Sequence, residues 1–354
     1  MSVYLNRIGT AVPGHEVHEA FCLFAASLFP DPHQGEIFHR MVDRAQIERR
    51  WSVLCPDPVD PTRGVTDGFY RRGDFPSTGA RMRRYAQEAP ALAFAALDDL
   101  ALDDNERASI THLIVASCTG FSAPGVDHAI REHLRLRPSV ERTIVGFMGC
   151  QAAITAMKLA WHVLRGTPDA KVLVVNLELC SLHLQQRPKL SQNLAFLLFG
   201  DGCSAALFSS APRGLRVDGF HAAVVAEAAG QITWHIGDDG FDMVLSGQVP
   251  ATLMRALPDQ LPVVLDGLDP TEIELWAIHP GGRSILDAVQ DGLALPQGAL
   301  AYSRDVLKDF GNMSSPTVMF VLRAMMDAAH PGQSGCAMAF GPGLSAEMMR
   351  FSTV

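Results

Sequence analysis

A single shift of 165 residues superposes two parts of the chain, and this constrains the fold more than any other feature. The shift places Gly146-Phe-Met-Gly-Cys150 on Gly311-Asn-Met-Ser-Ser315, and Lys171-Val-Leu-Val-Val175 on Cys336-Ala-Met-Ala-Phe340, with no gap between the two matches. One shift that matches a turn, its helix and the next strand indicates an internal duplication. Because strands and helices alternate in each half, we expect an α/β fold with two related sheets.

Apolar runs and turn residues predict where the elements of the two halves lie. The expected strands cover residues 3–12, 112–117, 142–147, 171–176, 203–208, 274–278, 335–340 and 346–351, and the expected helices cover 17–28, 37–51, 80–100, 151–164 and 311–328. We divide the chain into an N-terminal half, 1–210, and a C-terminal half, 211–354. The first half also carries an insertion, Leu179–Gly200, which we expect to form a lid or pocket wall.

Composition excludes several classes of protein. The net charge of 29 − 38 = −9 argues against nucleic-acid binding. The cysteines are odd in number and form no Cys-x-x-Cys pair, so we expect neither a metal site nor a disulfide framework. We expect a reducing, cytoplasmic location instead. The N-terminus lacks the layout of a signal peptide. No apolar run approaches the roughly 18 residues that span a bilayer.

Cys150 is the candidate nucleophile. Gly146 and Gly149 permit a tight turn from strand to helix, which would place Cys150 in the first turn of that helix. A helix N-terminus stabilises an anion, so we expect it to lower the pKa of this thiol and favour the thiolate. The alternative is a buried cysteine with a structural role, since free cysteine is among the most buried residue types.

His279 and Asn312 are the expected partners of Cys150. His279 ends a predicted strand of the second half, and Asn312 lies in the turn that duplicates the Cys150 turn. Sites of α/β proteins form where strands end, so the three residues should meet at the junction of the halves. An imidazolium can offset a thiolate, and imidazole and amide donors together can polarise a carbonyl oxygen. Each of the two residue types, taken alone, is more often structural.

These residues belong to motifs by which the chain resembles the type III polyketide synthases of the thiolase-like superfamily, which include plant chalcone synthase and bacterial relatives. The resemblance covers essentially the whole chain. It rests on Gly9-Thr-Ala-Val-Pro13, Arg40-Met with Ile47 and Arg49-Arg50, Gly149-Cys150, Leu198-Phe-Gly-Asp-Gly202, Ile278-His-Pro-Gly-Gly282, Gly311-Asn-Met-Ser-Ser315 and Phe340-Gly-Pro-Gly343. It implies a layered αβαβα architecture made of two duplicated halves.

The resemblance implies a decarboxylative Claisen condensation. Cys150 would take the acyl group of an acyl-CoA starter, and His279 and Asn312 would stabilise the enolate formed from malonyl-CoA. Repeated extension and cyclisation would give a pyrone or a resorcinol. The coenzyme A thioesters are substrates, and no cofactor or metal is implied.

Other roles are carried over position by position. Phe199 matches the gating aromatic residue beside the nucleophile. Arg40 and Arg44 match two of three basic positions that hold the coenzyme A phosphates, and the third position is Ile37. From the residues alone, both arginines could equally belong to a solvated face. The pocket-wall positions are Cys118, Thr119, His183, Trp234 and Ser314; of these, His183 and Trp234 depart from the chalcone synthase pattern of threonine and phenylalanine.

The resemblance is greatest to bacterial alkylpyrone and alkylresorcinol synthases. It implies a medium- or long-chain fatty acyl starter in an apolar tunnel beside Cys118 and Ala123. The opposing possibility is that His183 and Trp234 fill this space and restrict the enzyme to short starters or malonyl-CoA. A homodimer is implied as well, with Phe121-Ser-Ala-Pro-Gly125 near its interface.

Three other functions fit parts of the pattern. A ketoacyl carrier protein synthase III has the same fold and catalytic set but condenses once. A papain-like protease also has the order Cys, His, Asn, although its Cys-Gly-Ser-Cys-Trp context and signal peptide are missing here. The third is a catalytically dead acyl-binding member of the fold, against which the intact Cys150, His279 and Asn312 argue.

Overall fold

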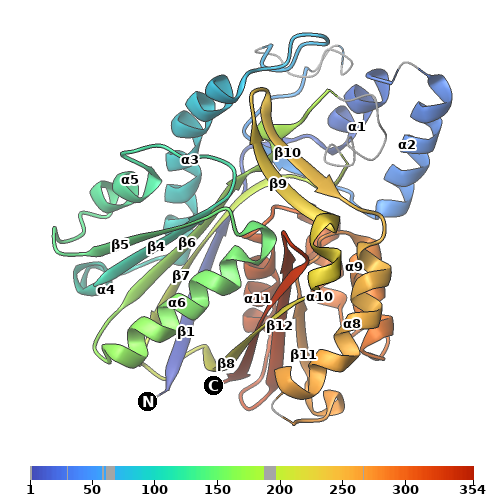
Figure 1. Ribbon diagram of the computed structural model, residues 1–354. Helices are drawn as coiled ribbons and strands as arrows, with labels where there is room; N and C mark the ends of the chain where they lie inside the picture. The colour runs from blue at the N-terminus through green and yellow to red at the C-terminus, as the bar shows by residue number, and fades with distance from the viewer. Residues whose placement is uncertain (1, 30, 58–59, 61–67, 187–196, 266) are drawn as a thin grey trace.

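The computed structural model describes residues 2–29, 31–57, 60, 68–186, 197–265 and 267–354 (Figure 1). In this part of the chain, nine strands form one sheet in the order β11-β12-β13-β8-β1-β7-β6-β4-β5. Their bounds are β1 (Val3–Ala11), β4 (His112–Ser117), β5 (Glu141–Gly146), β6 (Val172–Leu179), β7 (Asp201–Ser209), β8 (Leu215–Val224), β11 (Leu275–Ile278), β12 (Ser334–Gly341) and β13 (Ser345–Thr353). The eight predicted strands lie at the predicted places.

The sheet preserves the duplication. Outward from its centre, the order β1-β7-β6-β4 of the first half matches the order β8-β13-β12-β11 of the second. We expected two related sheets, and the structure corrects this. β1 pairs with β8 in antiparallel fashion, with Val3 opposite Val217, so the two halves share a continuous sheet. This pairing satisfies backbone groups that two separate sheets would leave at exposed edges.

Helices cover both faces of the sheet (Figure 1). Their bounds are α1 (His18–Ser27), α2 (Pro32–Ala45), α3 (Thr78–Leu100), α4 (Asp104–Ser109), α5 (Val126–His133), α6 (Ala152–Gly166), α8 (Val249–Val264), α9 (Arg283–Gly292), α10 (Ala301–Phe310) and α11 (Thr317–Ala328). α6 and its duplicate α11 share one apolar core with strands of both halves. The alternate side chains of the same strands face a second core with α3, α8 and α9. This alternation gives the expected layered α/β architecture.

One predicted helix is displaced. We expected a helix over 37–51, whereas α2 covers Pro32–Ala45. Asp31 caps its start by accepting a hydrogen bond from the His33 backbone N–H, and proline at the first helical position is favourable. Gln46 then adopts a left-handed conformation, with φ of 56°, and ends the helix.

Two short two-stranded sheets lie beside the main sheet. β2 (His15–Glu16) pairs with β3 (Trp51–Ser52), and β9 (Ile232–Gly237) pairs with β10 (Gly240–Leu245). The predicted insertion falls partly on 187–196, which lie outside the described residues. Across the described residues, no helix is both long and apolar enough to cross a membrane.

Candidate active site

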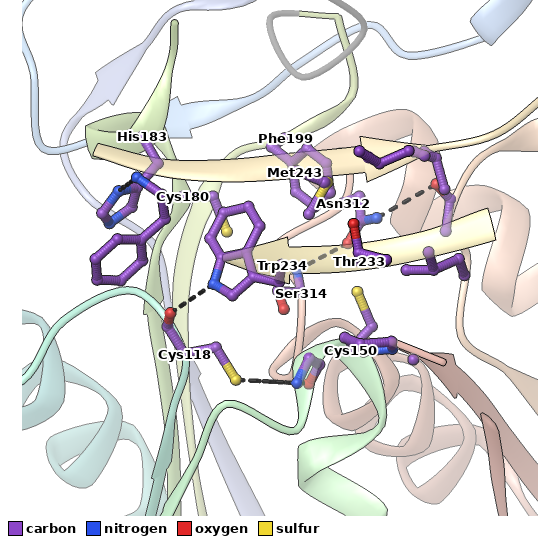
Figure 2. Close-up of a pocket in the computed structure, with 18 of the residues that line it drawn as sticks. Cys118, Cys150, Cys180, His183, Phe199, Thr233, Trp234, Met243, Asn312 and Ser314 are labelled. Carbon is purple, nitrogen blue, oxygen red and sulfur yellow. Dashed lines mark hydrogen bonds between the residues drawn. The ribbon is translucent and has the colours of Figure 1, made fainter. Parts of the chain in front are cut away.

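The ends of strands from both halves enclose a cavity of about 360 Å³ (Figure 2). All three predicted catalytic residues line it: Cys150, His279 and Asn312. So do the six residues predicted for the pocket wall and gate, which are Cys118, Thr119, His183, Phe199, Trp234 and Ser314. The structure therefore brings together nine side chains that the sequence spreads over almost 200 positions.

The turn before α6 aims Cys150 at the cavity. Phe147 and Gly149 both have positive φ, 56° and 66°, and Gly149–Gln151 forms a single 3-10 turn. A Cβ on Gly149 would lie 2.3 Å from the Pro342 side chain, so only glycine fits this approach. Pro342 comes from the Phe-Gly-Pro-Gly motif of the other half, which explains why the chain needs both motifs.

The pKa of Cys150 moves opposite to our expectation. We predicted that the helix N-terminus would lower it, whereas burial raises the pKa of this thiol to about 11. Hydrogen bonds from Ser314 and Asn312 act in the lowering direction but are the smaller effect. The side chain keeps some exposure only because it faces the cavity. In the unligated site the neutral thiol is therefore the stable form.

His279 has a buried imidazole without a hydrogen-bond partner. Its backbone N–H donates to the Met338 carbonyl at 2.8 Å, which fixes the residue just beyond β11. The side chain is 1% exposed, and neither ring nitrogen has a partner among the described residues. Burial lowers its pKa to about 3, so the ring is neutral. A buried unpaired polar group costs free energy, and such groups are typical of functional sites.

Asn312 is held with its amide nitrogen on the cavity side (Figure 2). Its Oδ1 accepts a hydrogen bond from the Ser314 backbone N–H at 2.8 Å, which fixes the orientation of the amide. Its Nδ2 donates one hydrogen to the Gly281 carbonyl at 3.3 Å. Since an amide nitrogen carries two hydrogens, one donor is left for Cys150 or a bound group.

Phe199 is held against the Asn312 turn. The two residues form an isolated parallel bridge, and Asn312 N–H donates to the Leu198 carbonyl at 2.9 Å. Behind them lies Arg50, which is 0% exposed and donates to the Phe199 carbonyl at 2.9 Å. The arginine also donates to His18 Nδ1 at 2.9 Å. These contacts fix the backbone of Phe199 and of Asn312 together.

Aromatic and imidazole rings close one end of the cavity. His183 stacks on Phe241 with ring centroids 4.1 Å apart, and Trp234 meets Phe241 edge-on. His183 Nε2 lies 2.6 Å from the Thr119 carbonyl, while Nδ1 accepts from the Phe241 N–H at 3.2 Å. Trp234 Nε1 donates to the Cys118 carbonyl at 3.1 Å. The rings are thus pinned to the cavity wall.

Sequence reasoning missed two residues of the site. Phe241 shares the inner face of β10 with Met243 and Leu245, an apolar alternation over 241–245 that could have indicated it. Glu178 is a fully buried carboxylate behind the cavity. It accepts hydrogen bonds from the Cys118 N–H at 2.9 Å and the Ser315 hydroxyl at 2.7 Å, and burial raises its pKa to about 7. The sequence could have indicated Glu178, because it is an acidic residue inside an otherwise apolar run that forms β6.

The two predicted phosphate-binding arginines lie outside this cavity. Arg40 and Arg44 are exposed on α2. Arg44 lines a second cavity of about 650 Å³, which shares Leu245, Val249, Gly281 and Ile285 with the first. Within the described ranges, no cluster of three metal-ligating side chains occurs.

Comparisons with known proteins agree over the whole chain. The family models for chalcone and stilbene synthases match residues 4–212 with the N-terminal domain and residues 220–354 with the C-terminal domain. The alpha-pyrone synthesis polyketide synthase-like Pks18 of Mycobacterium tuberculosis is 34% identical, covering 99% of this chain and 91% of that protein.

Solved structures give the same answer for the fold. The type III polyketide synthase domain of Steely1 from Dictyostelium superposes with a TM-score of 0.90 at 24% identity over 100% of both chains. The 1,3,6,8-tetrahydroxynaphthalene synthase of Streptomyces coelicolor, a bacterial type III polyketide synthase, superposes with a TM-score of 0.87 at 26% identity over 99% of both chains. These matches support neither the ketoacyl carrier protein synthase III nor the papain-like alternative. The chain belongs to the chalcone and stilbene synthase family, and it is a condensing acyltransferase of the type III polyketide synthases.

Proposed function

We propose that this chain builds a polyketide on Cys150 from an acyl-CoA starter and malonyl-CoA, with His279 and Asn312 as the donors that stabilise the enolate. The observation that carries this proposal is the convergence of the three side chains on one enclosed cavity from turns in both halves. The intact set, with a neutral imidazole and an amide hydrogen that the Gly281 carbonyl does not take, also argues against a catalytically dead acyl-binding protein.

Loading transfers the starter to the enzyme. The Cys150 sulfur attacks the thioester carbonyl of the acyl-CoA, a new carbon–sulfur bond forms, and the bond to the coenzyme A sulfur breaks. The thiol proton leaves with the coenzyme A thiol. Because burial raises the pKa of Cys150, this proton must depart as the sulfur attacks rather than beforehand.

Extension begins with malonyl-CoA. The bond between its carboxylate and the α-carbon breaks, carbon dioxide leaves, and the electron pair moves onto the thioester oxygen. Asn312 Nδ2 and a ring N–H of His279 donate hydrogen bonds to that oxygen. The enolate carbon then attacks the acyl group on Cys150, and the Cys150 sulfur leaves. The chain is longer by two carbons and can return to Cys150.

For the product we propose a pyrone, supported by the 34% identity to a protein named for alpha-pyrone synthesis. For the starter, the pinned positions of His183, Trp234 and Phe241 support the restricted alternative over the long apolar tunnel. Ala123, which we expected beside that tunnel, is exposed on the surface and does not line the cavity. We therefore propose short starters.

We further propose a homodimer formed along β5. This strand is one edge of the nine-stranded sheet, and it presents Ile144, 48% exposed, toward solvent. Phe121, 40% exposed, lies beside it and contacts Phe147 with ring centroids 5.5 Å apart. A strand edge with two exposed large apolar side chains beside it is normally covered, and a second copy of the chain would cover it.

We retain two further expectations as proposals. The first is a division into functional halves at residues 1–210 and 211–354. The second is a cytoplasmic location, which is supported by seven free thiols, five of them buried.

The deciding experiment follows the acyl group. The protein is incubated with malonyl-CoA and a panel of acyl-CoA starters, and adducts and products are identified by mass spectrometry. We expect the adduct on Cys150, and its loss with all products in Cys150→Ala. Cys180→Ala is the matched control, because this cysteine lines the same cavity and should leave loading intact. An adduct on any other cysteine would overturn the assignment.

A further inference from the structure

We propose, given the function proposed above, that Arg283 at the start of α9 binds a phosphate of the coenzyme A thioester. Nothing in the sequence patterns or the comparisons assigns this residue a role. The resemblance implies three basic positions for the phosphates, and α2 supplies only two of them because the third is Ile37. Arg283 supplies a guanidinium from α9, and this helix lies on the same side of the molecule as α2 (Figure 1).

The first observation in favour of this role is that Arg283 lines the second cavity. That cavity, of about 650 Å³, lies between the C-terminal part of α2, the end of β10 and the start of α9. It adjoins the Cys150 cavity, since Leu245, Val249, Gly281 and Ile285 line both spaces. This shared stretch carries no charged side chain. A coenzyme A thioester has its reactive sulfur at one end and its phosphates at the other, so a thioester at Cys150 places its phosphates outward, toward Arg283.

The second observation is the balance of charges around this cavity. Its charged lining residues are Arg44, Arg283 and Asp287. Asp287 is the one side chain there that would repel a phosphate, and it is bound from outside the cavity by Arg304 at 2.8 Å. Arg283 lies further from it, at 3.4 Å. The cavity lining thus holds two guanidiniums and one carboxylate, and that carboxylate is paired with a third guanidinium, which gives a local positive site on a chain with net charge −9.

The third observation is the orientation of the Arg283 guanidinium. Arg283 Nη1 donates to the Arg44 carbonyl at 3.4 Å, one of the last carbonyls of α2, and Nε faces Asp287. These contacts tether α9 to α2 and fix the direction of the side chain. Nη2 has no contact of this kind in the described part of the chain, and the side chain is 42% exposed. A guanidinium oriented in this way presents a free edge to a phosphate.

Binding measurements on free ligands test this without relying on catalysis. Calorimetry compares coenzyme A, 4′-phosphopantetheine and pantetheine on the native protein and on Arg283→Ala. We expect the affinity for coenzyme A to fall about tenfold, as for loss of one charged hydrogen bond, and the affinity for pantetheine to stay unchanged. A fall for 4′-phosphopantetheine as well assigns the contact to the phosphate next to the pantetheine arm. A fall for coenzyme A alone assigns it to the adenosine phosphates.

Arg323→Ala is the matched control, because Arg323 pairs with a carboxylate four residues further along its helix, as Arg283 does, and does not line the cavity. It should leave all three affinities unchanged, and Arg283→Lys should retain part of the affinity for coenzyme A. Equal losses for coenzyme A and pantetheine in Arg283→Ala, or no loss for either, would overturn the assignment. In turnover, the KM for acyl-CoA should rise with kcat unchanged, while the KM for the same acyl N-acetylcysteamine thioester, which lacks phosphates, stays constant. Absence of acyl-enzyme from both thioesters would instead refute the proposed function.

Discussion

Glu178 gives the most quantitative prediction for this protein. Its carboxylate is 0% exposed and accepts hydrogen bonds from the Cys118 N–H, the Thr119 hydroxyl and the Ser315 hydroxyl. It therefore joins the strand end beneath the cavity wall to the turn that carries Asn312. Despite these bonds, burial raises its pKa from 4.5 to about 7.

A raised carboxyl pKa makes stability depend on pH in a defined direction. Between pH 4.5 and about 7 the folded protein binds more protons at Glu178 than the unfolded chain does. The contribution of Glu178 to the free energy of unfolding therefore decreases as pH rises through this window, and it is constant above the window. The shift of about 2.5 units corresponds to about 3 kcal/mol between the two ends. Asp201, whose pKa burial raises to about 6, adds a decrease of the same sign.

Glu178→Gln isolates the contribution of this one group. A glutamine keeps an acceptor at the site but has no charge to bury, so the loss on raising the pH should be smaller by about 3 kcal/mol. The assay is urea unfolding of both proteins from pH 4 to pH 8, at one protein concentration because a dimer would add its own dependence. Asp201→Asn serves as the matched variant for the other buried carboxyl. Parallel pH profiles for the native protein and Glu178→Gln would refute the reasoning, whatever their constant offset.

Three further predictions concern the proposed site and assembly. Asn312→Ala should slow malonyl-CoA decarboxylation about 10²–10³-fold, as for loss of an oxyanion donor, and slow starter loading far less; equal losses in carbon dioxide release and adduct formation would contradict this. His183→Ala should move the optimum of turnover toward longer acyl-CoA starters, because it unpins the ring cluster; a native rate that already rises with chain length would contradict the closed end. Ile144→Asp should give a monomer in sedimentation at micromolar concentration, whereas Ile236→Asp, at a more exposed isoleucine on β9, should not.

The sequence was sufficient to predict that Cys150, His279 and Asn312 line one cavity, because each lies in a short motif with strong local requirements. Gly149 illustrates this, since its positive φ and its contact with Pro342 exclude every other residue. The duplication then placed the turns of Cys150 and Asn312 in equivalent positions. Two such constraints are enough to bring distant residues together without knowledge of the rest of the chain.

The burial of individual side chains could not be predicted from such local motifs. The low pKa that we expected for Cys150 took account only of the helix after it, whereas burial by all the chain packed around the thiol raises this pKa. Phe241 was missed for a similar reason, because its role comes from contacts with His183 and Trp234 on other elements. Continuity of the sheet depends on the pairing of β1 with β8, and no local pattern specifies that pairing.

The low pKa of His279 fits the proposed chemistry better than the imidazolium we first expected. An enolate needs a hydrogen-bond donor, but a strong acid beside it would protonate its carbon and destroy the nucleophile. Burial lowers the pKa of His279 to about 3, which keeps the ring neutral and its N–H a weak acid. A neutral imidazole can therefore donate to the enolate oxygen and keep its proton, as neutral histidine electrophiles do elsewhere. The same burial raises the pKa of Cys150, so both residues remain uncharged until a substrate arrives to share the charge.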